Sequence, residues 1–390
     1  MIRTHTIPCH LPKEQADTLN RESGGIYTGV LVAHWRVVRK KNIWLSEKAG
    51  TRLSDSRTDV KLHAHTVDAA QQGFYKACKT AKALKRVDPT AKYPHKPKKF
   101  RTTVWKNTAV KQKGHTLELS TGSKNPKIVI LLPEPLWSAL RFLEVRLVFN
   151  KKACRYVWHI VVENGKQIKP APGNNVVSVD LGEIHPAVVG DEKEATIVLG
   201  RERRHQMQGH AKRLAKIAKA ISRKRKGSRH HKRLLRARSR MKAKHETVMR
   251  DMEHKISRAI VDVAVESKAN TIAVGDIRDI ADGVALGKRT NQKISGWNHG
   301  KVMAYVKYKA EAEGMKVTLV DEKYTSQTCP NCRTRHKPRG RNYRCPSCGY
   351  RSHRDLVGQV NILSVFKFGE PGRIVAPTKI KHRLPYDIRL

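Results

Sequence analysis

The sequence has few acidic residues for its length. Its 390 residues include 33 Asp and Glu against 80 Lys and Arg, which gives a formal net charge of +47 at pH 7. A protein with this balance attracts polyanions, and nucleic acid is the commonest partner of such proteins, with a membrane surface as the alternative. The scarcity of acidic side chains therefore predicts a nucleic-acid partner.

Long apolar runs are also missing. No run of about 18 or more apolar residues occurs, and no short apolar segment follows the N-terminus, so neither a spanning helix nor a signal peptide is predicted. We expect an intracellular protein without a membrane partner.

Cysteine is scarce, and its distribution is uneven. Three of the seven cysteines, Cys9, Cys78 and Cys154, are scattered along the chain, and we interpret them as ordinary thiols. The other four lie in two close pairs. That pattern favours metal binding over a disulfide framework.

The composition divides the chain near residue 175, where Pro, Gly and Asn separate two ordered regions. Before this point, residues 11–95 are predicted to be mostly helical, and strands are predicted between residues 115 and 165. After it, apolar strands alternate with helices, including two long helices over residues 201–265 joined by a turn. This order predicts an α/β sheet. The tail from residue 373 is basic and interrupted by Pro, which is typical of a disordered segment.

The two cysteine pairs have the spacing of a zinc site. Cys329-x2-Cys332 and Cys345-x2-Cys348 are separated by twelve residues, and each pair can place two thiolates on one tight turn. We predict a closed four-thiolate site that holds structural zinc. Redox exchange by a C-x-x-C pair is the alternative, and the presence of two matched pairs argues against it. The module serves as a folding staple, as a nucleic-acid contact, or as both. Its candidate nucleic-acid contacts are Arg333, Arg335, His336, Lys337, Arg339 and Arg341.

Acidic side chains stand at the ends of apolar strands. Asp180, Asp276 and Glu322 lie at three strand ends, and Asp355 precedes the last helix. Taken singly, such a residue is more often a turn former or a helix N-cap. However, strand ends in an open α/β sheet face the crevice where ligands bind, and clustered carboxylates need a cation. If these residues converge, they are expected to hold two Mg²⁺ ions about 4 Å apart that clamp a scissile phosphate.

Several motifs follow one another in an order that is specific to one family. The segments SVDLGEIHPAVV, TIAVGDI, YTSQTCPNC with YRCPSCGYRSHRD, and HRDLVGQVNI resemble the TnpB proteins of insertion sequences, which are relatives of type V CRISPR effectors. The resemblance implies an RNase H-like RuvC nuclease domain with an inserted zinc ribbon. It further implies an N-terminal β-barrel-like wedge domain that carries a helical recognition insertion. Asp180 and Asp355 match the first and last catalytic acids of the family.

The resemblance also implies domain boundaries. We expect a wedge β domain formed by residues 1–10 and 96–172, with a helical recognition domain over residues 11–95. The RuvC-like nuclease domain is expected over residues 176–326 and 353–390, interrupted by a zinc ribbon over residues 327–352.

The middle catalytic acid departs from the common family pattern. Most members carry Glu then Asp after the apolar strand, whereas Gly275 stands at the Glu position here and only Asp276 follows. Because strand side chains alternate between faces, Asp276 is expected to point away from the cleft. A subset of the family, resembling the eukaryotic Fanzor proteins, has a relocated Glu just before the YTS segment, where Glu322 stands. We therefore predict three catalytic magnesium ligands, which are Asp180, Glu322 and Asp355. The alternatives are Asp276 as the middle acid and an inactive site.

A dense basic run covers residues 201–258, which hold 22 Lys and Arg against four acidic residues. A charge run of this kind is usually a solvated face, and a localisation signal has the same composition. Here most of the charges lie on predicted helices with one apolar side, which favours a track along a phosphate backbone. The residues predicted to bind nucleic acid are Arg223, Lys224, Arg225, Lys226, Arg229, Lys232, Arg233 and Arg236.

The leading interpretation is a transposon-associated, RNA-guided DNA endonuclease that hydrolyses phosphodiester bonds with two Mg²⁺ ions. Its expected partners are a guide RNA and target double-stranded DNA, in a ribonucleoprotein with a single protein chain in the prokaryotic cytoplasm, associated with the nucleoid. A nuclease-inactive, RNA-guided DNA-binding regulator is the first alternative, and Gly275 favours it. A zinc-ribbon nucleic-acid-binding protein without a guide is the second.

Overall fold

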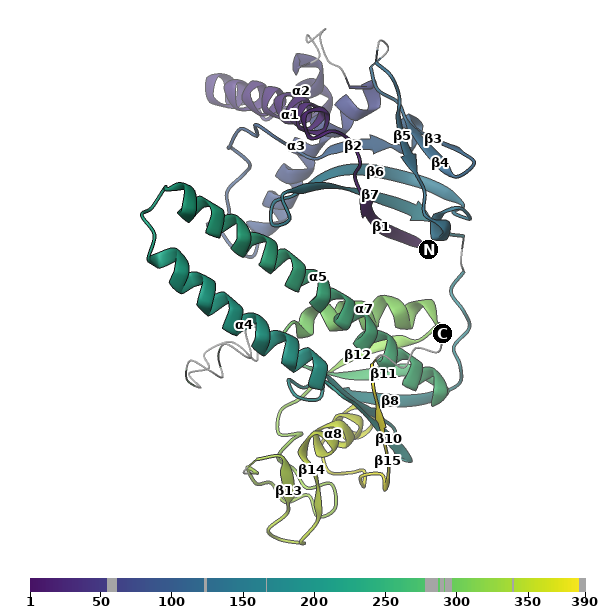
Figure 1. Cartoon of the computed structure of the whole chain (residues 1–390). Coiled ribbons are helices and arrows are strands. Elements are labelled where there is room, and N and C mark those ends of the chain that lie inside the picture. Colours follow the sequence, from purple (N-terminus) through teal and green to yellow (C-terminus); the bar gives the residue numbers. More distant parts are fainter. Residues whose placement is uncertain are drawn as a thin grey trace. The chain divides into compact units, whose positions relative to one another are not determined.

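The chain folds into two compact units, residues 1–166 and 167–390. Figure 1 shows the computed structural model of the whole chain. The structure describes residues 1–54, 62–122, 125–165, 167–277, 287, 291, 297–338 and 340–385.

Three helices belong to the first unit. They are α1 (Lys13–Lys41), α2 (Glu47–Ser54) and α3 (Ala64–Leu84). α1 and α3 pack through an apolar cluster in which the rings of Tyr27 and Phe74 meet edge to face, with their centroids 5.9 Å apart. The predicted helical character of this region is therefore confirmed for its described residues.

Two antiparallel sheets complete the first unit. In order, one sheet contains β1, β7, β6 and β2, and the other contains β3, β4 and β5. Side chains from both sheets and from α1 form one core, in which the ring centroids of Trp105 and Trp158 are 5.7 Å apart. The strands are β1 (Ile2–Pro8), β2 (Thr103–Lys106), β3 (Val110–Lys113), β4 (Thr116–Leu119), β5 (Ile128–Leu131), β6 (Arg141–Asn150) and β7 (Arg155–Glu163). Two 3-10 turns, η1 (Asn107–Ala109) and η2 (Glu134–Leu136), lie between them.

A six-stranded sheet forms the centre of the second unit, in the order β12, β11, β8, β9, β10 and β15. β8, β11 and β12 run parallel to one another, and β9 is antiparallel to its neighbours. The carboxyl ends of β8, β11 and β12 therefore lie at one edge, where ligand sites form in open α/β sheets. The strands are β8 (Asn175–Asp180), β9 (Ala187–Gly190), β10 (Glu194–Val198), β11 (Ala269–Asp276), β12 (Lys316–Asp321) and β15 (Lys379–Arg383).

Helices cover both faces of this sheet. α5 (Arg229–Glu266) and α7 (His299–Ala312) pack on one face, where Val177 and Val179 of β8 join their apolar cluster. The intervening Ser178 instead donates a hydrogen bond to the Gln359 carbonyl of α8 (Arg354–Phe368), on the other face. The alternation along β8 thus directs Ser178 and Asp180 toward α8.

α4 (Arg201–Ser222) and α5 form a long hairpin, which confirms the two helices and the turn predicted from the sequence. The Ser228 hydroxyl oxygen accepts a hydrogen bond from the His231 N–H at 3.2 Å and thereby caps α5. None of the helices described in this chain is long and apolar enough to cross a membrane.

The C-terminal tail departs from the expectation of disorder. Residues 379–383 form β15, which pairs in parallel with β10. The Glu194 carboxylate of β10 lies 2.9 Å from the ammonium groups of both Lys379 and Lys381. Composition alone did not predict this strand because its partner is distant in the sequence, and the pairing is made by backbone groups and by these opposite charges. The last residues, 386–390, lie outside the described part of the chain.

Candidate active site and cysteine cluster

Three carboxylates from separate segments lie near the carboxyl ends of the parallel strands. Asp180 is the last residue of β8, Glu322 directly follows β12, and Asp355 lies in the first turn of α8. Burial raises the pKa of Asp180 well above its ordinary value, and the negative charges of Glu322 and Asp355 raise it further. The structure therefore places Glu322 and Asp355 each within electrostatic reach of Asp180.

α8 lies directly against the first of these acids. A Cβ at Gly358 would lie only 2.5 Å from Oδ2 of Asp180, so any side chain at this position would displace the carboxylate. Gly358 follows Asp355 by three positions, which places both residues on the same side of α8. Close packing at Gly358 thus sets the position of Asp355 relative to Asp180.

Glu322 fills the position of the missing side chain at residue 275. Val179 of β8 pairs with Val274 of β11, so the next residues, Asp180 and Gly275, lie side by side. A Cβ at Gly275 would overlap the carboxylate of Glu322. The carboxylate therefore occupies the space beside Asp180 into which a longer residue at position 275 would extend.

The charge on Glu322 has little compensation from the protein. Its Oε1 atom is buried and has no hydrogen-bond partner among the described residues. Burial raises the pKa of Glu322 to about 7, with further contributions from the negative charges of Asp276 and Asp321. Buried carboxylates with raised pKa values and a free oxygen are a suitable environment for a divalent cation, which prefers oxygen ligands.

Asp276 lies near this cluster on the opposite face of the sheet. Its neighbour Ala273 packs with Ile362 of α8, whereas Val274 packs in the cluster that contains α5 and α7. Alternation therefore assigns Asp276 to the α5 and α7 face, as the sequence predicted. Its charge still reaches Glu322, whose pKa it raises.

Two buried amides of α8 fix the acids relative to one another. The Gln359 side chain donates hydrogen bonds to the Ser178 hydroxyl at 2.7 Å and to the Gly190 carbonyl at 3.0 Å, which joins α8 to β8 and β9. The Asn361 side chain donates to the carbonyls of Thr325 and Thr328 at 2.6 and 2.8 Å.

The segment bound by Asn361 begins at the middle acid, Glu322. Thr325 donates hydrogen bonds to the Glu322 carbonyl from its backbone N–H, at 3.1 Å, and from its hydroxyl, at 2.9 Å. Asn361 consequently links the turn that carries Glu322 to the helix that carries Asp355.

Other groups around Asp355 were not assigned to this site from the sequence. Arg341 of the cysteine module forms an ion pair with Asp355 at 3.1 Å. His353 accepts a hydrogen bond from the Asp355 N–H at 3.2 Å, and its ring lies 5.2 Å from that of His185. In the sequence, His185 lies five positions from Asp180 and His353 lies two positions from Asp355. This closeness to the predicted acids was the signal that could have assigned both histidines to the site.

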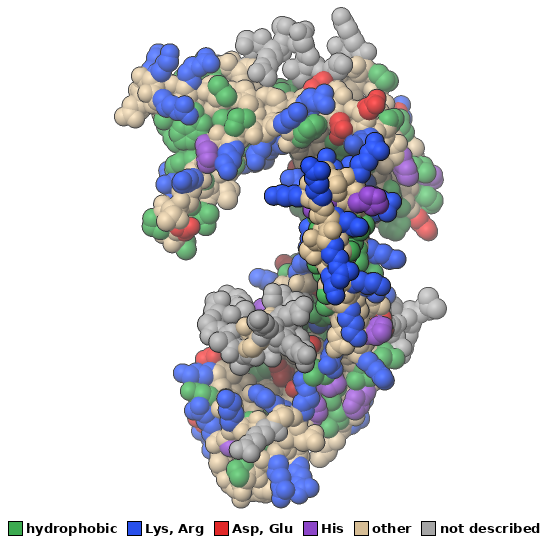
Figure 2. Space-filling view, turned by 60° about the vertical axis from the view of Figure 1, so that its left-hand side comes forward, with side chains coloured by type: hydrophobic (Ala, Val, Ile, Leu, Met, Phe, Trp, Pro, Cys, Tyr) green, Lys and Arg blue, Asp and Glu red, His purple; other side chains and the backbone are tan. Residues whose placement is uncertain are grey.

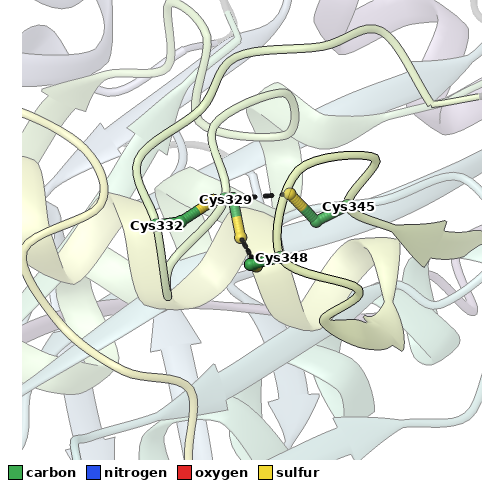
Figure 3. Close-up of side chains that lie close together, drawn as sticks. All are labelled: Cys329, Cys332, Cys345 and Cys348. Atoms are coloured by element: carbon green, nitrogen blue, oxygen red, sulfur yellow. Dashed lines mark hydrogen bonds between the residues drawn. The ribbon is translucent and has the colours of Figure 1, made fainter.

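The four paired cysteines converge on one point (Figure 3). The Sγ atoms of Cys329 and Cys348 are 3.6 Å apart, and those of Cys332 and Cys345 are 3.4 Å apart. A tetrahedral zinc site with Zn–S bonds of about 2.3 Å has S–S edges of about 3.8 Å, whereas a disulfide is about 2.05 Å long. The cluster therefore fits a zinc ion and not two disulfides.

The two cysteine turns have matching backbone conformations. The residue four positions after the first cysteine of each pair has positive φ, 63° for Arg333 and 70° for Gly349. Each donates its N–H to that first cysteine's carbonyl, at 2.9 and 3.2 Å. The module, with strands β13 (Asn342–Arg344) and β14 (Arg351–His353), packs Cys329 and Cys345 against Val357 of α8. Arg339, a candidate nucleic-acid contact, lies outside the described residues.

The predicted basic residues surround the tip of the α4–α5 hairpin. Figure 2 shows Lys and Arg side chains gathered where this hairpin comes forward. All eight residues are solvent-exposed, so their charges are available to a partner; they are Arg223, Lys224, Arg225, Lys226, Arg229, Lys232, Arg233 and Arg236.

Comparison with protein families gives two matches. Residues 159–281 match a family described as a probable transposase (OrfB_IS605), and residues 299–362 match the Cas12f1-like TNB domain. The second match covers the segment from α7 through the cysteine module to α8.

The chain is also similar to individual curated proteins. It is 32% identical over 112 residues to the CRISPR-associated endodeoxyribonuclease Cas12f1 of Sulfoacidibacillus thermotolerans, which covers 28% of this chain and 25% of that protein. It is 30% identical over 114 residues to a TnpB-like protein of Methanocaldococcus jannaschii, a match that covers 29% of this chain and 41% of that protein. A TnpB-like protein of Acidianus two-tailed virus is 28% identical over 212 residues, which covers 53% of this chain and 45% of that protein. The chain thus spans less than half the length of each of these relatives.

Two solved structures share the fold. A Cas12f1–sgRNA–target DNA complex has a TM-score of 0.59 at 14% identity, covering 90% of this chain and 83% of that one. The mini-RNA-guided endonuclease CRISPR-Cas_phi3 has a TM-score of 0.54 at 11% identity, and the match covers 97% of this chain and 94% of that one. The predicted fold class is confirmed by these likenesses together with the cysteine cluster.

Proposed function

Because this chain belongs to the TnpB family, we propose that it is an RNA-guided DNA endonuclease that hydrolyses phosphodiester bonds. The observation that carries the proposal is the placement of Glu322 and Asp355 close enough to Asp180 for their charges to raise its pKa, with Glu322 in the space left by Gly275. A site that had simply lost its middle acid would have no carboxylate in that space. The arrangement therefore favours a working nuclease over an inactive DNA-binding regulator.

We assign the magnesium ligands to the same three carboxylates. Burial, and then the charges of Glu322 and Asp355, raise the pKa of Asp180, and Oε1 of Glu322 has no partner within the described part of the chain. Bound cations would stabilise both carboxylates in their ionised form. Divalent cations in such a site supply Lewis-acid stabilisation of the charge that develops on the phosphate and lower the pKa of a bound water.

The protein's own groups orient the substrate. The guanidinium of Arg341 lies beside Asp355, with its side chain 43% exposed, and is thus placed to bind a phosphate oxygen of the incoming strand. Gly358 and Asn361 fix the positions of the acids, so that the DNA strand binds to carboxylates that are already in place.

The cysteine cluster has a structural role in this proposal. With four thiolates, Cys329, Cys332, Cys345 and Cys348 leave no open position for a substrate on the zinc ion that they would hold. The closed site instead maintains the module that presents Arg341 to the acids.

The exposed cations of the α4–α5 hairpin are proposed to bind the phosphates of a guide RNA and its DNA target. Proteins of this type read the shape of the heteroduplex, and base pairing reads the sequence. We further propose a ribonucleoprotein with one protein chain, in the cytoplasm of a prokaryote. The domain ranges implied by the family resemblance are retained as part of this proposal.

Cleavage of a target plasmid tests the proposed function. The chain is purified after co-expression with its flanking noncoding RNA and is assayed with Mg²⁺ or EDTA. We expect sequence-guided cutting that requires Mg²⁺ and is lost in Asp180→Asn and Asp355→Asn. Guided binding without cutting by the wild type would instead identify a regulator, and the absence of a retained RNA would overturn the guided mechanism.

A further inference from the structure

A cavity of about 670 Å³ lies between α4 and α5, away from the acidic cluster. Its volume is in the range of small-molecule sites, about 300–1,000 Å³. The lining residues are Gln206, His210, Arg213, Arg240, Met241, Lys244, His245 and Val248.

Helical spacing places complementary groups on its two walls. On α4, Gln206, His210 and Arg213 recur at intervals of four and three, so they share one face of the helix. On α5, Met241 and His245 recur in the same manner. The cavity is therefore formed by two matched helix faces along the hairpin.

The lining of the cavity is largely apolar and includes two aromatic rings. The rings of His210 and His245 stack with their centroids 3.7 Å apart and their planes 6° apart. Met241 and Val248 provide adjoining apolar surface, and both are partly buried. A planar heteroaromatic ring is the type of group that such a surface accommodates by stacking.

Burial favours the neutral form of both imidazoles. Burial lowers the pKa of His210 to about 4, and the charges of His245, Arg213 and Lys242 lower it further. Burial also lowers the pKa of His245. The Nδ1 atom of His210 is buried and without a hydrogen-bond partner among the described residues.

The rim of the cavity is cationic. Arg213, Arg240 and Lys244 are all exposed beside the buried rings. This placement of charge disfavours a cationic or purely apolar ligand. A nucleotide fits both parts, because its base is planar and its phosphate is anionic.

We propose that this cavity binds one unpaired nucleotide of a nucleic-acid strand held by the protein. The base enters against His210, His245 and Met241, and the adjacent phosphates lie on the cations of the rim. The proposal rests on the proposed function, since a nucleic acid must first be bound along the hairpin. RNA and DNA share this chemistry, and the experiment distinguishes them.

Ultraviolet crosslinking at 254 nm, followed by trypsin digestion and mass spectrometry, tests the proposal. Cleavage after Arg204, Lys212, Lys244 and Arg250 isolates His210 in residues 205–212 and His245 in residues 245–250. A crosslink on either peptide in the protein–RNA complex identifies an RNA nucleotide. One that appears only after target DNA is added identifies a DNA nucleotide. The proposal would be overturned if both samples, without and with target DNA, showed crosslinks on other peptides and none on these two.

Filling the cavity provides a second test. Met241→Trp is expected to abolish the crosslink and to weaken RNA or DNA binding by about 5- to 100-fold, the loss of one stacked base. Ala215→Trp, which adds the same side chain at an exposed position of α4, is expected to change neither. Guided plasmid cleavage is measured in parallel. Cutting with no crosslink and no effect of Met241→Trp would reject the cavity proposal alone, whereas failure of guided cutting by the wild type would reject the proposed function.

Discussion

The Glu322 carboxylate lies where a side chain at Gly275 would extend, beside Asp180. Two residues 47 positions apart in the sequence thus share one site: glycine provides the space, and glutamate provides the charge. This relationship makes specific predictions about both positions.

Gly275→Ala is expected to reduce guided DNA cleavage by about 100-fold, because the new Cβ displaces the Glu322 carboxylate and a displacement of about 1 Å at a reacting centre has costs of this order. Single-turnover rates at saturating Mg²⁺ measure the effect. Gly300→Ala on α7 is a matched control, since a Cβ there meets no atom within 4 Å. Equal rates for wild type and Gly275→Ala would show that the position of Glu322 is unimportant.

Glu322 should make the cation-free protein less stable as the pH rises. Its pKa is about 7 in the folded protein against an ordinary value of 4.5, so between these values the folded state binds more protons than the unfolded state. Stability contributed by this group is therefore present below pH 4.5 and lost by about pH 7.

Thermal unfolding in EDTA measures this loss. Glu322→Gln is expected to melt about 2–4 °C above the wild type at pH 8, with a difference that shrinks toward pH 5. Mg²⁺ should raise the melting temperature of the wild type at pH 8 more than that of the variant. A difference between the two proteins that does not depend on pH would contradict the assigned pKa.

Asn361→Ala is expected to lower both stability and cleavage. The change leaves the buried carbonyls of Thr325 and Thr328 without their donor, at a cost of about 1–3 kcal/mol, and releases the turn that carries Glu322. Denaturant unfolding and cleavage rates are the measurements, and Asn174→Ala at an exposed position is the control. If Asn361→Ala lost stability but its folded fraction cleaved DNA at the wild-type rate, Asn361 would not position Glu322.

Cys345→Ser is expected to reduce bound zinc from one equivalent per chain and to destabilise the protein. The thiolate cluster contacts Val357, so its loss should also disturb α8 and the nearby Asp355. Elemental analysis and thermal unfolding test this expectation. Cys154→Ser is the control, because that thiol is exposed and isolated in the sequence from the four paired cysteines. Retention of a full equivalent of zinc in Cys345→Ser would reject the four-thiolate assignment.

Local patterns predicted the elements with strong periodicity. The apolar positions on α5 and the cysteine spacing each reflect neighbours on one helix or one turn, and the structure contains both features. The strand that ends at Asp180 was predicted for the same reason.

Three features that depend on distant pairing were not predicted. β15 arises from its pairing with β10, and the approach of α8 to Asp180 at Gly358 depends on tertiary packing. The ion pair of Arg341 with Asp355 joins two elements that only the folded module brings together. Sequence periodicity contains no information about such contacts.

The most direct test of the central claim is to return the acid to position 275. We would compare guided plasmid cleavage by Glu322→Ala with that by the double variant Gly275→Glu/Glu322→Ala, after confirming that both fold and bind the target. The account predicts a loss of about 100-fold or more in Glu322→Ala and recovery to within about tenfold of the wild type in the double variant. Wild-type cutting by Glu322→Ala, or a folded double variant no more active than the single one, would contradict the account.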